Sequence, residues 1–158
     1  MIRCVIPTII KSILREHAVT LVKWIIISNY YNKIMKRGKM MKVATRHFVR
    51  PEFMNHHQTL YAGYISEWVT EAAMIGVTEK LGTNEQVVLA ALKEVVIKKE
   101  VVSGMILQLD YEVSKIGVTS IEILVEGKNF LTGESHLTGR AVFVTVDENG
   151  KKRPHGLS

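Results

Sequence analysis

The chain has 158 residues, which is long enough for a single domain with a substantial hydrophobic core. Residues 1–42 carry a local charge of +8 within a net charge of +6, so residues 43–158 carry −2. The high basic balance therefore gives no support for nucleic-acid binding by the main part of the chain. Cys4 is the single cysteine, which excludes a disulfide framework and fits a reducing, cytoplasmic setting.

The first segment, residues 1–41, is basic and apolar and is predicted to lie outside the main domain. Its longest uncharged stretch, residues 24–32, is far shorter than the roughly 20 residues of a spanning helix, so we expect no transmembrane segment. A secretory signal is not evident either. Two interpretations remain: an amphipathic segment that contacts a membrane surface or a partner, or an upstream start with Met35, Met40 or Met41 as the true beginning.

A strand is expected at residues 42–48, and a polar loop then leads into a helix within NHHQTLYAGYISEWVTEAA, residues 55–73. Spacings of three and four residues predict one packing face made of Tyr61, Ile65, Trp68, Ala72 and Gly76. Glu67 and Glu71 lie one turn apart on roughly the opposite side. Such a pair is also typical of a solvated helix face, so spacing alone does not assign it a function.

Four further strands are predicted at residues 87–97, 102–116, 118–126 and 134–146. The second of them alternates apolar and polar residues, which predicts one buried face and one polar face. The apolar set is Met105, Leu107, Leu109, Tyr111 and Val113, and the polar set is Gln108, Asp110, Glu112 and Ser114. Turn residues at Gly117 and at residues 127–133 indicate consecutive hairpins, and hence an antiparallel sheet. The prediction is an α+β domain with one helix laid on one sheet.

Several segments, in order, resemble the acyl-CoA hydrolase branch of the hotdog-fold acyl-CoA thioesterases. Asn55, Tyr61 and the small pair Ala62 and Gly63 resemble the loop and helix start of that family, with an acidic helix following. Residues 117–120 resemble its Gly-x-Thr-Ser hairpin, and residues 143–154 resemble its last strand and Asp-x-x-Gly-x-x-Arg-Pro run. The resemblance covers residues 46–157 and begins just after the internal methionines, which favours the upstream-start interpretation.

The resemblance implies a hotdog domain over residues 42–158, with one long central helix wrapped by an antiparallel sheet of about five strands. The implied activity is hydrolysis of acyl-CoA to the free acid and coenzyme A. Two departures stand beside it: Thr70 occupies the position of the family's catalytic Asp, and Gln58 replaces a loop Gly. A non-catalytic acyl-CoA or acyl-carrier binding protein on the same fold is therefore the alternative. A dehydratase-type hotdog protein is a third option, which the NHHQ loop matches poorly.

By resemblance, the catalytic residues are Asn55, Gly63, Thr70 and Glu71. The backbone N–H groups near Gly63, with Asn55 or His57, would polarise the acyl carbonyl. Glu71 would activate water as a general base, or attack the carbonyl to give a mixed anhydride, and Thr70 would position the water. Glu67 is the less favoured base. The ordinary alternatives are a turn residue for Asn55, a solvated acid for Glu71 and a packing residue for Thr70.

Coenzyme A binding is expected, by resemblance, at a tunnel between subunits. The residues assigned to it are His57, Thr119, Ser120, Lys151, Lys152, Arg153 and Pro154. A hairpin turn and a solvated basic tail would explain most of them equally. No cofactor is required, because coenzyme A is part of the substrate, and adjacent His56 and His57 suit one metal ion poorly.

The family pairs its subunits, so the expected partners are acyl-CoA and a second copy of the chain. We expect a homodimer or a trimer of dimers, that is, a hexamer. Asn55 of one chain and Glu71 of its neighbour would then face the same tunnel.

Overall fold

A computed structural model describes residues 41–157 of the chain, so the predictions for the extension lie almost entirely outside the described residues. The helical elements are η1 (Pro51–Phe53) and α2 (Ala62–Leu81). The strands are β1 (Lys42–Phe48), β2 (Val87–Ile97), β3 (Ile106–Ile116), β4 (Ser120–Asn129) and β5 (Ser135–Thr145). The α+β prediction and the prediction of one helix with five strands are confirmed.

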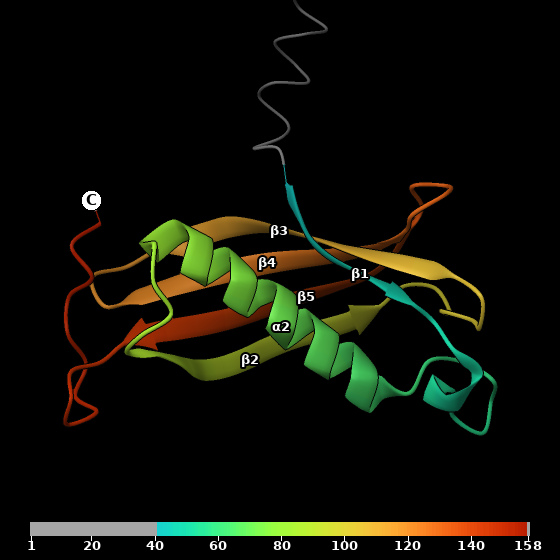
Figure 1. Ribbon diagram of the computed structural model, residues 1–158, viewed down its shortest axis with the longest axis horizontal. Coiled ribbons are helices and arrows are strands. Elements are labelled where there is room, and N and C mark those ends of the chain that lie inside the picture. Colours follow the sequence, from blue (N-terminus) through green and yellow to red (C-terminus); the bar gives the residue numbers. More distant parts are fainter. Residues whose placement is uncertain (1–40, 158) are drawn as a thin grey trace, which may run out of the picture. The chain divides into compact units, whose positions relative to one another are not determined.

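The five strands form one antiparallel sheet in the order β1-β3-β4-β5-β2, and α2 runs across one face of it (Figure 1). Consecutive hairpins link β3, β4 and β5, as the turn signals predicted. The chain's first two strands take the outer places, so β1 and β2 are the free edges. The helix packs mainly on β3, β4 and β5 and touches β1 less.

The helix lies close to the sheet because small residues allow it. A Cβ at Gly76 would lie 2.4 Å from Cδ2 of Tyr111 on β3, and a Cβ at Gly139 on β5 would lie 2.4 Å from Cγ1 of Val69. The predicted packing residues Ile65, Trp68, Ala72 and Gly76 are buried. Tyr61 is the exception, because it precedes the helix as its N-cap and is 56% exposed.

One further detail of the sequence prediction is wrong. Gly127 is not in a turn but inside β4, where it gives room to Leu137; a Cβ there would lie 2.7 Å from Leu137 Cγ. The turn that follows is closed by Asn129, whose Oδ1 accepts a hydrogen bond from the N–H of Leu131 at 2.9 Å.

The predicted polar face of β3 is polar, and part of it is covered by side chains of neighbouring strands. Gln108 and Asp110 are buried at 7% and 3% exposure, although they lie on the face away from α2. Long side chains of neighbouring strands cover them: Arg46 donates through Nε to Gln108 at 2.7 Å, and Lys128 pairs with Asp110. Period-two alternation locates the two faces, but it does not say how far neighbouring strands cover them.

Candidate functional site

The loop before α2 is closed by Asn55. Its Oδ1 accepts hydrogen bonds from the N–H groups of His57 at 2.8 Å and Thr59 at 3.3 Å, and its Nδ2 donates to Thr59 Oγ1 at 3.0 Å. Gln58 has a φ of 60°, in the left-handed region that favours glycine. The loop thus keeps a conformation that suits the glycine of the resembling family. Asn55 holds the loop within the chain, and its action on a carbonyl or water stays a prediction.

The start of α2 offers backbone donors. Tyr61 makes no side-chain capping bond, so the first turn's N–H groups have no side-chain partner. The Gly63 position is crowded by the Tyr61 ring, whose Cε1 would lie 2.3 Å from an added Cβ. The aromatic rings of Phe53, Tyr64 and Trp68 pack beside this turn. A carbonyl oxygen at this end of the helix would meet the N–H groups of the first turn and also the positive end of the helix dipole.

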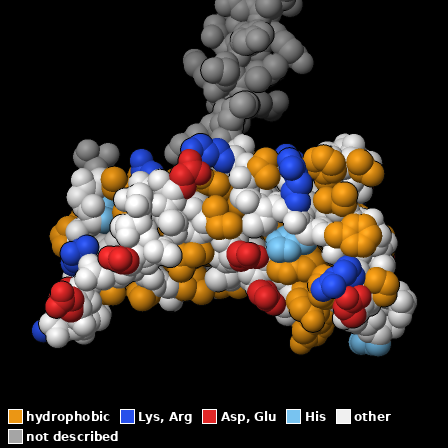
Figure 2. Space-filling view, in the orientation of Figure 1, with side chains coloured by type: hydrophobic (Ala, Val, Ile, Leu, Met, Phe, Trp, Pro, Cys, Tyr) orange, Lys and Arg blue, Asp and Glu red, His pale blue; other side chains and the backbone are white. Residues whose placement is uncertain are grey.

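One side of α2 faces β1, and Glu71 lies on it. Glu71 Oε2 is 3.6 Å from Nε2 of His47, whose ring stacks on Trp68 at 4.2 Å with an interplanar angle of 5°. Glu79, further along this side, pairs with Lys42. We call this side, made of Trp68, Glu71 and Glu79, the β1 flank. In Figure 2, acidic side chains gather near a histidine over this part of the molecule.

Burial lowers the pKa of His47 below its ordinary value, although the charges of Glu71 and, less strongly, Glu67 favour the protonated form. Sequence patterns did not single out His47, because its meeting with Glu71 depends on where β1 lies beside the helix.

The other side of α2 faces β5. Val69 touches Gly139 of β5, and each following residue turns by about 100°, so Thr70 lies further round, away from β1. Gly63, two turns earlier, shares this side, as does Ser66. We call these three residues the β5 flank. Thr70 Oγ1 donates to the carbonyl oxygen of Ser66 at 2.7 Å. Helical spacing thus puts Gly63 and Thr70 on one side of α2, two turns apart, and turns Glu71 about 100° away from Thr70.

Beside the β5 flank lies an apolar strip of the edge strand β2. Leu89, Leu92 and Val95 pair with Phe143, Ala141 and Gly139 of β5, and directly paired residues point to the same face of a sheet. Gly139 faces α2, so the strip faces the helix side too. Val95 lies opposite Gly139, the residue that Val69 of the helix touches, and Leu89, further along the strand, is 42% exposed, so this edge strand leaves apolar surface open.

The predicted coenzyme A residues near the C-terminus come together at the far end of the helix. The N–H of Thr145 donates to the carbonyl of Thr119 at 3.0 Å, and the N–H of Arg153 donates to the carbonyl of Thr145 at 2.9 Å. Val146 and Lys152 form an isolated bridge. The side chains of residues 151–154 are exposed. His57 is separated from this cluster by α2, whose 20 residues span roughly 30 Å.

Two kinds of feature are absent from the part of the chain that the structure describes. Within residues 41–157, no three or more His, Cys, Asp or Glu side chains are grouped to hold a metal ion. Nor does any helix there have the length and apolarity needed to cross a membrane.

Comparison with known proteins gives relatives of one kind, although no protein-family model matches the chain. An uncharacterised acyl-CoA thioester hydrolase of Bacillus subtilis is 28% identical over 126 residues, which are 77% of this chain and 70% of that protein. An acyl-CoA hydrolase of Staphylococcus aureus, solved with butyryl coenzyme A, coenzyme A and coenzyme A disulfide, has a TM-score of 0.64 and 29% identity. That match covers 70% of this chain and 66% of the other, just under two thirds.

An apo-hexameric acyl-CoA thioesterase has a TM-score of 0.61 and 30% identity, over 72% of this chain and 74% of that one. The five-stranded antiparallel sheet with its single long helix is thus a hotdog fold. Within that fold, the chain belongs to the acyl-CoA thioesterase family.

Proposed function

We propose that this protein hydrolyses acyl-CoA thioesters to the free carboxylic acid and coenzyme A. One observation supports this above the others: Gly63 and Thr70 lie on the same flank of α2, beside an open apolar strip. Backbone donors at a helix start suit a thioester carbonyl, and an apolar surface suits an acyl chain. The membership in the thioesterase family points the same way.

The site is completed, in this proposal, by a second copy joined across β2. The free edge of β2 bears four large exposed apolar residues, Val88, Leu89, Val96 and Ile97, and such an edge is a template for pairing. Two identical edges pair antiparallel about a two-fold axis, which sets the helix start of one chain beside the helix end of the other. The loop with Asn55 and His57 then approaches the partner's basic cluster. A homodimer follows, and the hexameric relative supports a trimer of dimers.

The chemistry proposed for the site needs no strong general acid, because a thiolate leaves readily. The N–H groups around Gly63 would stabilise the negative oxygen of the tetrahedral intermediate. Glu71 would take the proton from the attacking water, or attack the carbonyl itself. In the single chain its carboxylate is turned to His47, so this role requires the side chain to turn away from β1 or to serve a neighbouring chain's site. Thr70 and Asn55 would position the water or the carbonyl.

Coenzyme A enters this proposal as part of the substrate, and no metal is needed for the reaction. Lys151 and Arg153 are placed to meet its phosphates, with Thr119, Ser120 and Pro154 beside them and His57 contributed by the other chain. A cytoplasmic setting, where acyl-CoA is present, is part of the same proposal.

One observation favours a second candidate function, the non-catalytic binding of acyl-CoA. The hydroxyl of Thr70 is occupied by the carbonyl of Ser66, and Glu71 lies on the other flank of the helix. Gly63, Ser66 and Thr70 therefore present no carboxylate to the open strip. A protein of this kind would hold coenzyme A without turning over its thioesters.

Thiol release from short, medium and long acyl-CoAs tests the proposal, with Glu71→Gln as the main variant. His47→Gln is the matched control, because it removes the partner of Glu71 and leaves the carboxylate. Turnover that Glu71→Gln abolishes and His47→Gln retains supports hydrolysis with Glu71 as base.

Absence of turnover in the wild-type protein, with coenzyme A still bound in calorimetry, would contradict hydrolysis. Gain of turnover in Thr70→Asp would then establish the binding protein and identify the missing acid.

A further inference from the structure

His136 of β5 is a buried histidine with one bonded and one unbonded ring nitrogen. The residue is 5% exposed, and its Nδ1 lies 2.8 Å from the carbonyl oxygen of Glu100. A carbonyl oxygen only accepts, so Nδ1 carries a proton and is the donor. Nε2 is buried and has no hydrogen-bond partner within residues 41–157, although the carboxylate of Glu134 stands 3.7 Å away. The bond to Glu100 is therefore the one hydrogen bond of this side chain in that part of the protein.

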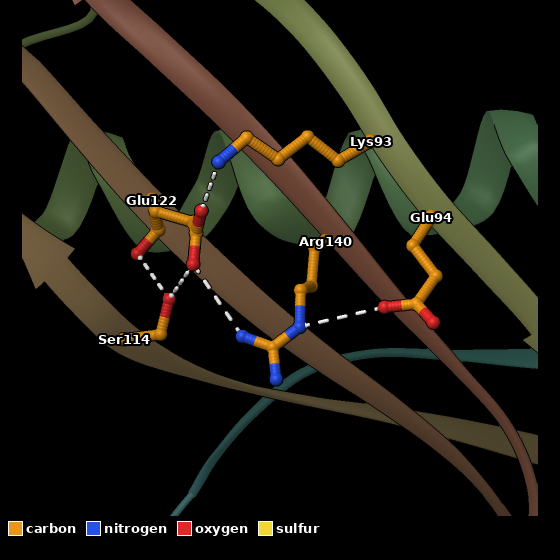
Figure 3. Close-up of polar contacts among 5 residues, drawn as sticks. All are labelled: Lys93, Glu94, Ser114, Glu122 and Arg140. Carbon is orange, nitrogen blue, oxygen red and sulfur yellow. Dashed lines mark hydrogen bonds and ion pairs between the residues drawn. The ribbon is translucent and has the colours of Figure 1, made fainter.

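The contact that His136 makes differs from the polar contacts elsewhere in the sheet. Figure 3 shows Glu122 of β4 among side chains of β2, β3 and β5, so that network ties strands to one another. His136 instead reaches from its strand to the connection between β2 and β3, residues 98–105, in which Glu100 lies. Its ring therefore fixes a loop rather than a strand.

The loop around Glu100 is bonded on both sides of that residue. The N–H groups of residues 98 and 99 donate to the carbonyl oxygen of His136 at 2.7 and 3.1 Å. Further along, the carbonyl oxygen of Val101 accepts from the N–H of Leu60 at 2.8 Å. Val101 and Leu60 are buried, at 2% and 4% exposure, so water competes little for this bond. The His136 ring thus holds the peptide group directly before the one that binds Leu60.

Leu60 stands immediately before the start of the helix. Tyr61 is the N-cap of α2, and Gly63 is the second residue of the helix. The N–H of Tyr61 donates to the carbonyl of Phe53 at 2.9 Å, so the chain is tied at two successive residues before the helix begins. These bonds set the direction in which the first N–H groups of α2 point. A small displacement of Leu60 would move the donors around Gly63.

We propose that His136 is a positioning residue for the thioester site, and that it holds the start of α2 through residues 100–101 and Leu60. It touches no substrate. It acts on the N–H groups around Gly63, so it stabilises the oxyanion of the transition state and contributes little to binding of the ground state. This role rests on the hydrolysis proposed above, because only a thioester carbonyl gives the position of these donors a catalytic consequence.

Two nearly isosteric replacements separate the donor of the ring from its volume. Asn and Leu both branch at Cγ, but only the amide of His136→Asn keeps an N–H at the place of Nδ1. We expect His136→Leu to lower kcat by about tenfold with a smaller change in KM, because a misplaced donor acts on the transition state. His136→Asn should keep most of the wild-type kcat. Glu134→Gln is the matched control, because it removes the carboxylate beside Nε2 and leaves the bond to Glu100, so both constants should stay unchanged.

Amide hydrogen exchange of the full chain, followed by NMR, shows whether the effect is local. In His136→Leu the N–H of Leu60 should exchange about tenfold faster than in the wild type, while the amides of the central strand β4 keep their rates. In His136→Asn both should exchange as in the wild type. A general loss of stability would accelerate the β4 amides as well, so this measurement separates positioning from a merely structural role.

Equal kcat in His136→Asn and His136→Leu, or equal acceleration at Leu60 and in β4, would overturn the positioning role. If circular dichroism shows that His136→Leu does not fold, His136→Gln takes its place, because its amide lies one bond beyond the δ position. A wild-type protein without turnover would contradict the proposed hydrolysis. Faster exchange confined to Leu60 would even then show that His136 fixes the start of the helix, which separates the two failures.

Discussion

The two flanks of α2 differ in how they are completed. On the β1 flank, the chain itself supplies the partners: His47 stacks on Trp68 and meets Glu71, and Lys42 pairs with Glu79. On the β5 flank, Gly63, Ser66 and Thr70 are small, and the neighbouring strand β2 remains open. A helix of this length thus has one flank that stabilises the single chain and one flank that is available for a ligand and a second copy.

The helix carboxylates and the backbone N–H donors of α2 lie in different places. Glu71 and Glu79 lie on the β1 flank, and the backbone donors lie at the start of the helix, where Gly63 of the β5 flank stands. The acids of the β1 flank contact residues of β1: Glu71 meets His47, and Glu79 pairs with Lys42. Catalysis by Glu71 therefore requires it to change partner, whereas binding of a carbonyl at Gly63 requires no rearrangement of the chain.

Gly63→Ala is the sharpest test of the role proposed for the β5 flank. An added methyl group displaces the Tyr61 ring and crowds the donors of the first turn, so we expect turnover to fall by about 10²-fold, the loss typical of one oxyanion donor. Stability should stay equal or rise by about 0.5–1 kcal/mol, because alanine is the better helix former. Steady-state kinetics and urea unfolding measure the two effects. A parallel loss of both stability and turnover would show that Gly63 serves packing.

The closeness of helix and sheet under the β5 flank is tested by Gly139→Ala. The new Cβ would lie 2.4 Å from Val69 Cγ1, so overpacking should cost about 1–3 kcal/mol of unfolding free energy in urea titrations. Val69→Ala is the matched change, because it removes the obstructing methyl groups. The double variant should lose less than the two single variants added together. Strict additivity would mean that these two residues do not limit the approach of the helix.

For the β1 flank, we predict that stability depends on pH through His47. Burial lowers the pKa of His47 below 6.5, so the folded protein favours the neutral ring. Its contribution to stability is complete above the ordinary pKa and is lost as the pH falls through the lowered one. The free energy of unfolding should therefore drop as the pH falls below 6.5 and through the lowered pKa of His47, and His47→Phe, which can keep the stacking on Trp68, should reduce that drop. If the free energy of unfolding of the wild-type protein and of His47→Phe depends on pH in the same way, His47 does not contribute to the pH dependence.

The smallest effect is expected on the sheet face opposite α2, in the ion-pair network that links β2 with β4 and β5. Glu122 accepts from Lys93 at 2.6 Å and from Ser114 at 2.8 Å, so Glu122→Gln should cost up to about 1 kcal/mol in chemical unfolding at neutral pH. Its hydrogen bond from Lys93 lowers the pKa of Glu122, so this difference should vanish as the pH falls through that lowered value. Glu94→Gln, which removes a single contact at 3.6 Å, is the weaker control.

Much of the fold was predictable from local patterns. The strand and helix positions follow from alternation, helical spacing and turn residues, because each signal is short-range. The errors have one cause in common. Gly127 within β4 and the exposed Tyr61 depend on which side chains of neighbouring elements cover a position, and spacing along the chain does not carry that information.

The sequence proposed residues for the candidate site, and their roles are untested. The structure brings Thr119 and the C-terminal run together, and their assignment to coenzyme A stays a prediction. The predicted roles of Asn55, Thr70 and Glu71 stay predictions. The sequence does not predict that Thr70 and Glu71 lie on different flanks. Helical spacing gives the angle between the two residues, and only the positions of the strands show which strand each side of the helix faces. His47 was missed for the same reason.

Mixing of inactive variants tests most directly that the site is shared between two copies. Asn55→Ala and Glu71→Gln chains are purified separately and then refolded together, and thiol release is measured. Random pairing gives mixed dimers with one restored site each, so the account predicts recovery of about a quarter of wild-type turnover. A mixture that stays as inactive as its two parents would contradict a site built from Asn55 of one chain and Glu71 of the other.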